Sequence, residues 1–315
     1  MATVSRTLNG IEIVAAPTRD HVLKIANELD YIPHSGARAL STKRTDTIGV
    51  LLPDLHGEFF SELIRGIDLA ARARGLHLLL SSSHGDPVEA AAALRAMRSR
   101  VDSIIMMSLN AGNDAVVPAA PAGVPLILLG GSSGNASHPS FVIDNYAGAF
   151  AITEHLAGGG NRRIAFVAGP VDNSEARERL RGYRAALAHT GGRISEWIVQ
   201  GDFSEESGRE AARTLAAQGP PDAIFCANDM MAIGCLEGLR EAGITVPGDV
   251  ALAGFDDIPI TRYVHPPLTT AAVPIAEMGR QALECCAAAI AGRPTDLQHT
   301  FKPVLVIRAS SAGRS

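Results

Sequence analysis

The stretch YIPHSGARALSTKRTDTIGVLLP, residues 31–53, joins two parts of the chain that have different sequence patterns. A short basic segment with helical periodicity precedes this stretch, and a long alternation of apolar strands and amphipathic helices follows it. Pro33 suits the first turn of a helix, whereas Gly36 and its small neighbours make such a helix marginal by itself. We therefore expect residues 33–40 to become helical only when another molecule holds them.

The apolar run that begins at Ile48 is typical of a strand that is buried on both faces. Further strands are predicted at 77–80, 103–107, 125–129, 141–143, 164–167, 197–200, 223–226, 250–254 and 304–308. Helices are predicted between them, at 59–74, 147–156, 175–189, 205–218, 230–242 and 275–291. This alternation indicates an α/β fold with parallel sheets, and its two rounds indicate two lobes. Because ligands of open α/β sheets bind beyond the carboxyl ends of the strands, we expect one cleft between the lobes.

The composition fits a globular protein, since 46% of the 315 residues are apolar and 19% are charged. Residues 1–44 contain six Lys or Arg and four Asp or Glu, a net charge of +2. The total charge is −5, so the remainder of the chain carries −7. This weak asymmetry has the sign expected of a nucleic-acid-facing segment on an acidic body.

The four cysteines show no CxxC or Cys/His spacing, so we expect Cys226, Cys235, Cys285 and Cys286 to be reduced packing residues. Polar residues follow Met1 without an apolar targeting segment, and no run is long enough to span a bilayer. We therefore expect a cytoplasmic protein, and the sequence indicates neither a metal nor another cofactor.

The basic segment is predicted to contain two short helices. The first covers residues 2–10 and stops at Gly10, and the second begins after Thr18 as its N-cap. An apolar stripe marks the second helix, at Val22, Ile25, Ala26 and Leu29. Two helices of this length cannot bury a core alone, so we expect them to need a third.

Ten motifs occur in the order in which they occur in the lactose-repressor (LacI/GalR) family of bacterial transcription regulators, which the chain resembles along its length. They are ATVSRTLNG at 2–10, ELDYIPHSGARAL at 28–40, TIGVLLPDLHGEFFSELIRGI at 47–67, VIDNYAGAF at 142–150, NRRIAFVAGP at 161–170, ERLRGYRAAL at 178–187, GDFSEESG at 201–208, FCANDMMAIG at 225–234, DVALAGFDD at 249–257 and PPLTT at 266–270.

The resemblance implies three units and a sensor like the type I periplasmic binding proteins. A helix-turn-helix head would occupy residues 1–32, and a hinge helix with its linker residues 33–46. An effector-binding and dimerisation body would follow over 47–315. Its N-lobe would take 47–143 and 275–300, and its C-lobe 144–272 and 301–315. The resemblance further implies a homodimer on a near-palindromic operator, and the absence of a heptad repeat after Arg308 favours a dimer over a tetramer.

The chain departs from the family at its start. The family's head has three helices, and the motif ATVSRTLNG corresponds to the second. We expect the true start codon to lie upstream of Met1, so that the first helix is restored. A natural regulator without that helix is the alternative.

Two groups of residues are implied to contact DNA. The second helix of a helix-turn-helix lies in the major groove, where arginine binds guanine edges or phosphates, and the resemblance places Thr3, Ser5, Arg6 and Asn9 there. In the family's hinge, a leucine inserts into the minor groove and opens a base step. The resemblance assigns that part to Leu40, with Ala37 and Arg38 in support.

Eight residues are implied to bind the effector, namely Asp54, Phe59, Phe60, Asn173, Arg179, Phe203, Asn228 and Asp256. Their chemistry suits a sugar or sugar derivative, because guanidinium and carboxylate groups bind hydroxyls and aromatic rings cover an apolar sugar face. Of the adjacent pair Phe59 and Phe60, we expect Phe60 to face the ligand and Phe59 the core. For Phe203, packing and ligand contact are equally well supported.

Several neighbouring polar residues are interpreted as structural. Asp229 is expected to cap the helix that follows it, and Asp144 and Asn145 are expected to stabilise the lobe crossover. His56 is interpreted as a loop residue near the mouth of the cleft.

No nucleophile–base pair and no phosphate-binding loop is visible, which argues against an enzyme. The leading interpretation is a ligand-responsive repressor of carbohydrate-related genes. The alternative is a solute-binding protein without DNA-binding activity, which would carry a signal peptide and no hinge. The effector, the operator and the choice between induction and corepression stay open.

Overall fold

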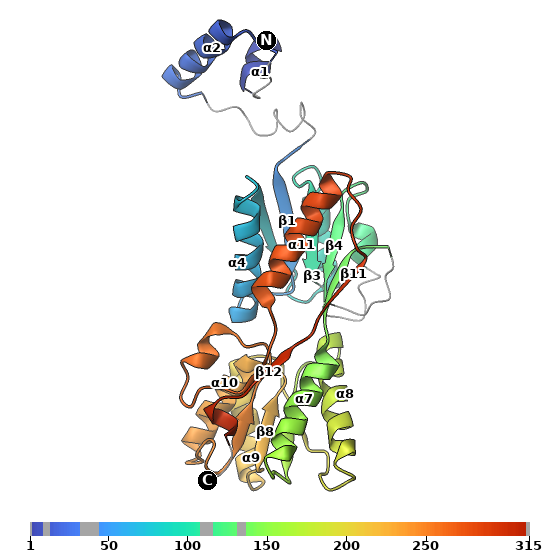
Figure 1. Ribbon diagram of the computed structural model, residues 1–315, viewed down its shortest axis with the longest axis vertical. Helices are drawn as coiled ribbons and strands as arrows, with labels where there is room; N and C mark the ends of the chain where they lie inside the picture. The colour runs from blue at the N-terminus through green and yellow to red at the C-terminus, as the bar shows by residue number, and fades with distance from the viewer. Residues whose placement is uncertain (1, 9–12, 32–43, 108–115, 131–136, 313–315) are drawn as a thin grey trace.

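The computed structural model describes residues 2–8, 13–31, 44–107, 116–130 and 137–312. These residues form a small head of two helices and a body of two stacked α/β lobes (Figure 1). The predicted hinge helix at 33–40 lies outside the described residues.

The N-lobe is built on six parallel strands in the order β11-β5-β4-β3-β1-β2. The strands are β1 (Thr47–Leu52), β2 (His77–Ser82), β3 (Ser103–Met107), β4 (Leu126–Leu129), β5 (Ser140–Ile143) and β11 (Gln298–Phe301). The elements that flank them are α4 (Glu58–Arg72), α5 (Pro87–Ala96), η1 (Val117–Ala119) and α11 (Ile275–Ile290).

Both faces of the N-lobe sheet are buried, as the apolar run from Ile48 predicted. Alternate β1 residues, among them Val50, pack with Leu63 of α4 and Leu283 of α11. Leu51 points to the other face and packs with Leu94 of α5. The backbones of α4 and α11 approach very closely, since a Cβ on Gly66 would lie 1.9 Å from the carbonyl oxygen of Ala276.

The C-lobe is built on four parallel strands in the order β7-β6-β8-β9. The strands are β6 (Ile164–Ala168), β7 (Ile198–Gln200), β8 (Ala223–Cys226) and β9 (Ala251–Ala253). The helices are α7 (Asn145–Gly158), α8 (Ser174–His189), α9 (Glu205–Ala217) and α10 (Asp229–Glu241). Helix α7 packs against α8 and α9 against α10, so that two helix pairs enclose the sheet (Figure 1).

The chain passes between the lobes three times, after β5, after β10 and after β11 (Figure 1). At this junction β10 (Thr270–Ala272) pairs antiparallel with β12 (Val304–Val306), and the short helices η2 (Pro259–Arg262) and η3 (Ala309–Ser311) lie nearby in the chain. All four cysteines are free and buried, as expected. No helix among the described residues is long and apolar enough to cross a membrane.

The head contains α1 (Ala2–Leu8) and α2 (Ala16–Glu28). The expected N-cap at Thr18 is wrong, because α2 begins at Ala16 and the amide of Thr18 already donates to the carbonyl of Ala15. Pro17 lies in the first turn, where its missing amide costs no hydrogen bond. No described residue of α2 is buried, and Leu29 just beyond it is 72% exposed, whereas Thr7 of α1 and Val14 before α2 are buried.

Candidate functional site

A cavity of about 640 Å³ lies between the lobes, at the carboxyl ends of the parallel strands. All eight residues implied to bind the effector line it, namely Asp54, Phe59, Phe60, Asn173, Arg179, Phe203, Asn228 and Asp256. The volume is of the size that encloses a small organic ligand. Residues from both lobes form the wall, so a ligand here would contact both.

Arg179 of α8 is the centre of the C-lobe wall. Its Nε donates to Asn145 Oδ1 at 2.7 Å, its Nη1 to the carbonyl of Ala227 at 2.5 Å, and its Nη2 to Asp256 Oδ1 at 3.2 Å. The guanidinium also lies 3.9 Å from the centre of the Phe255 ring. Three of its five N–H groups are therefore used in hydrogen bonds within the protein. The side chain is held in place before any ligand arrives.

Two buried carboxylates flank this guanidinium. Nη2 of Arg179 lies 3.2 Å from Asp256 Oδ1 and 3.7 Å from Glu175 Oε2. Burial raises the pKa of Asp256 to about 7, although Arg179 acts in the opposite direction. Burial likewise raises the pKa of Glu175, with Arg179 again opposing the shift. The desolvation of both carboxylates outweighs the attraction of the one guanidinium between them.

Five α-helices begin at the cavity, and four of them have the first turn capped by a side chain, whereas α4 begins after Gly57 without such a cap. The caps are Asp86 for α5, Asn173 for α8, Ser204 for α9 and Asn228 for α10. Asn173 Oδ1 accepts two backbone hydrogen bonds, and the amide group of Asn228 both accepts from Met231 N and donates to the carbonyl of Phe203. The two asparagines implied to bind the effector thus also hold the local backbone.

Three phenylalanines give the cavity an apolar wall. Phe59 and Phe60 make an edge-to-face contact with ring centres 5.6 Å apart, and both rings line the cavity. Both rings are half-buried and also pack against the core, so the expectation that Phe60 rather than Phe59 contacts the ligand stays a prediction. Phe203 and Asp256 adopt positive φ angles of 76° and 111°, which side-chain-bearing residues rarely do. Such backbone strain is typical of functional sites.

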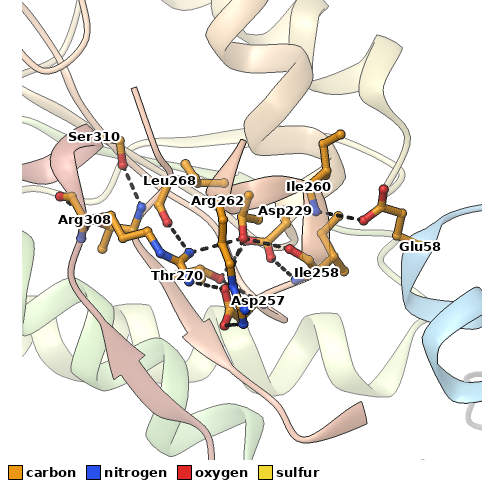
Figure 2. A network of polar contacts seen from close by, with 12 residues as sticks. Glu58, Asp229, Asp257, Ile258, Ile260, Arg262, Leu268, Thr270, Arg308 and Ser310 are labelled. Carbon is orange, nitrogen blue, oxygen red and sulfur yellow. Dashed lines mark hydrogen bonds and ion pairs between the residues drawn. The ribbon is translucent and has the colours of Figure 1, made fainter. Parts of the chain in front are cut away.

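A polar network lies behind the cavity and joins the lobes (Figure 2). Asp229 is fully buried and accepts from Thr270 Oγ1 at 2.7 Å and from Ile258 N at 3.0 Å. The expectation that Asp229 caps its helix is therefore wrong, because Asn228 is the cap. Burial raises the pKa of Asp229 well above its usual range, with Asp256 adding to the shift.

Asp257 anchors the segment that reaches the other lobe. Its carboxylate pairs with Arg308 at 2.6 Å and with Arg262 at 3.2 Å. Figure 2 shows Glu58 extending toward this segment, and its Oε2 accepts from the backbone amide of Ile260 at 3.0 Å. One end of the network thus neighbours Asp256 in sequence, and the other end contacts α4 of the N-lobe.

Other polar residues interpreted as structural have observed partners. Asp144 caps α7, and Asn145 holds Arg179. Asp54 is exposed, and one of its oxygens accepts from the amides of Leu55 and His56. His56 itself lines the cavity and is exposed.

The sequence reasoning missed Glu175 and Phe255. Glu175 lies one turn before Arg179 on α8, a spacing that predicts contact between the two side chains. Phe255 directly precedes Asp256, but no periodic pattern marks its ring as the support of a guanidinium. Among the described residues, no group of three or more His, Cys, Asp or Glu side chains could hold a metal ion.

The residues implied to contact DNA are described only in part. Thr3 and Arg6 are exposed on α1, where a DNA duplex could reach them. Ser5 belongs to the same helix, but its side chain is not described. Asn9, Ala37, Arg38 and Leu40 lie outside the described residues.

Comparisons with known proteins match both parts of the chain. The family described as bacterial regulatory proteins, lacI family, matches residues 1–34, and the periplasmic binding protein-like domain matches residues 153–311. The catabolite control protein A of Priestia megaterium is 34% identical over 287 residues, which cover 90% of this chain and 86% of that protein.

Two solved structures extend the likeness over nearly the whole chain. The transcriptional regulator CelR–cellobiose complex has a TM-score of 0.76 and 31% identity, and the match covers 98% of this chain and 95% of that one. The lac repressor dimer bound to operator and the anti-inducer ONPF has a TM-score of 0.89 and 28% identity, and the match covers 98% of this chain and 94% of that one.

Proposed function

The chain belongs to the LacI family of bacterial regulatory proteins, and from this premise we propose that it is a ligand-controlled transcription repressor. It is a regulator rather than an enzyme, as its relatives are. In this proposal a homodimer binds a near-palindromic operator in the cytoplasm. A sugar or sugar derivative binds in the interlobe cavity and changes the affinity for the operator.

One observation carries the proposal: the likeness to the operator-bound lac repressor dimer, at a TM-score of 0.89, extends over head and body together. A solute-binding protein would share only the body. The cavity supports the ligand part of the proposal, because it combines phenylalanine rings with a preoriented guanidinium and carboxylates, the groups that bind a polyol.

The polar network links the C-lobe segment beside the cavity to helix α4 of the N-lobe. A ligand that contacts Asp256 and Phe60 touches both lobes, so it changes the free-energy difference between lobe arrangements. In a dimer, a change in lobe angle alters the spacing of the two hinge segments and therefore their fit to the operator. By linkage, operator and ligand must alter each other's affinity by the same factor.

Fluorescence anisotropy with the duplex upstream of the protein's own gene tests the DNA part of the proposal. We expect binding that exceeds binding to a scrambled duplex of equal length by at least about a hundredfold, within the range of specific regulators. Leu40→Ala should weaken operator binding about tenfold or more, because an inserted apolar side chain supports the bend in the DNA. Equal affinity for the two duplexes would overturn the proposal.

A further inference from the structure

The wall of the interlobe cavity carries an excess of negative charge. Among the described residues that line it, seven are Asp or Glu and one, Arg179, is a Lys or Arg. Glu175 and Asp256 are buried beside Arg179. The remaining five are more exposed, at Asp54, Asp86, Asp172, Asp202 and Glu205. In a site partly shielded from water, this imbalance acts on the charge of any ligand that enters.

Glu175 is the cavity carboxylate that lies near Arg179 without a hydrogen bond from it. It is only 8% exposed and lies 3.7 Å from Nη2 of Arg179, beyond hydrogen-bond distance, whereas Asp256 takes the hydrogen bond from that nitrogen. No other described residue donates to the Glu175 carboxylate. Glu175 lines the cavity, so its carboxylate can accept a hydrogen bond from a ligand that brings a hydroxyl, an N–H group or an ammonium to it.

Most of the helix N-termini at this cavity are capped by side chains of the protein, and the exception is α4. Helix N-termini attract phosphates and carboxylates through their free amides. At this cavity, α5, α8, α9 and α10 all begin with their first-turn amides capped by side chains of the protein itself. The side chain that caps α5 is itself the carboxylate of Asp86. Among these helices only α4 offers an anion a first turn without a side-chain cap, whereas seven carboxylates line the same wall.

We propose that the cavity selects an uncharged or amino-bearing polyol, such as a free sugar, an amino sugar or a nucleoside, and rejects phosphorylated and carboxylated ligands. The donors of the ligand reach Glu175 and Asp256, and its ring lies against the phenylalanine wall. This inference rests on the proposed function, since it assigns the chemistry of the same effector site. Its test measures ligand binding alone. The selectivity inference can therefore fail although the protein binds its operator, and operator binding can fail although the selectivity is as inferred.

The test measures thermal shifts of the full chain with matched probes that differ in charge. The probes are D-glucose, D-glucosamine and D-glucose 6-phosphate, with adenosine and adenosine monophosphate as a second series. We expect any stabilisation to come from an uncharged or amino-bearing probe, with its phosphorylated counterpart binding at least about tenfold more weakly. A phosphorylated probe that stabilises the chain more than its uncharged counterpart overturns the proposal.

If no probe shifts the melting temperature, the test is made on the unliganded protein, by measuring how its melting temperature depends on pH. A carboxyl whose pKa is raised by folding stabilises the protein at low pH, and that contribution is lost as the pH rises through the folded-state pKa, about 7 for Asp256. The charged groups that face one another here are Arg179 and Glu175 of α8, Asp229 of α10, and the adjacent Asp256 and Asp257.

The melting temperature of the unliganded wild type should therefore fall between pH 5.5 and pH 8. Glu175→Gln should reduce that fall, because it removes one of the two carboxylates that share Arg179. Glu178→Gln is the matched control, since Glu178 lies on the same helix but is exposed and paired with Arg181. An equal fall in wild type and Glu175→Gln would show that Glu175 does not compete with Asp256 for Arg179, and the proposed role of Glu175 in ligand selection would be wrong.

Discussion

The carboxylate of Glu58 in the N-lobe accepts a hydrogen bond, 3.0 Å long, from the backbone amide of Ile260 in the C-lobe. Glu58 opens the helix that also carries Phe59 and Phe60, and Ile260 follows the strained Asp256–Asp257 pair by a few residues. The contact thus connects the two walls of the cavity outside the cavity itself. It is positioned to favour the observed arrangement of the lobes over others.

Loss of this contact should be visible at a single amide. In Glu58→Ala the amide of Ile260 loses its acceptor, so we expect its hydrogen exchange to quicken by about fivefold, equivalent to roughly 1 kcal/mol. Residue-resolved hydrogen exchange measures this directly. Glu58→Gln retains a side-chain acceptor and serves as the control. Unchanged exchange at Ile260 in Glu58→Ala would show that the lobes are not joined there in solution.

Arg179 should contribute to stability as well as to ligand binding. Lysine preserves the charge, but it cannot reach Asn145, the carbonyl of Ala227 and Asp256 at once. We expect Arg179→Lys to lower the free energy of unfolding by about 2–4 kcal/mol, as measured by urea denaturation. Arg184→Lys on the same helix alters an exposed pair with Glu196 and should change stability by less than about 1 kcal/mol. Equal effects of the two substitutions would refute this role.

The packing of α4 against α11 depends on the absence of a side chain at Gly66. A Cβ there would lie 1.9 Å from the carbonyl oxygen of Ala276, so one helix must move to admit it. We expect Gly66→Ala to cost at least about 2 kcal/mol in the free energy of unfolding. Gly158 ends α7 with open space around it, so Gly158→Ala should leave stability unchanged or raise it by up to about 1 kcal/mol. The same loss in both variants would contradict the close helix contact.

Local sequence patterns predicted most of the fold because both faces of the central strands are apolar. The run from Ile48 to Leu52 has this character, and it forms β1, which pairs with a strand on each side. By contrast, β11 was not predicted, since Gln298, His299 and Thr300 form a polar edge strand that pairs on one side only. Its position is set by pairing with β5, far away in sequence, which no local pattern reveals.

The same limit applies to the candidate site. Resemblance to the family indicated which residues meet at the cavity, but not how they share their hydrogen bonds. Arg179 and Asp256 lie 77 residues apart, so their contact does not follow from periodicity, although the helical spacing of Glu175 and Arg179 could have indicated theirs. The cap of α10 was predicted one residue too late, because Asn228 and Asp229 are both good caps and only their hydrogen bonds distinguish them: Asn228 accepts from Met231 N, whereas Asp229 accepts from Ile258 N and Thr270 Oγ1.

The central claim is that the cavity and the operator site are coupled, and one measurement tests it most directly. Operator affinity is measured by fluorescence anisotropy with and without a small molecule that stabilises the chain, for wild type and for Asp256→Asn. We expect the ligand to change the wild-type Kd about fivefold or more, and to leave the Kd of Asp256→Asn nearly constant. A ligand that binds in the cavity yet leaves the wild-type operator Kd unchanged would contradict the account.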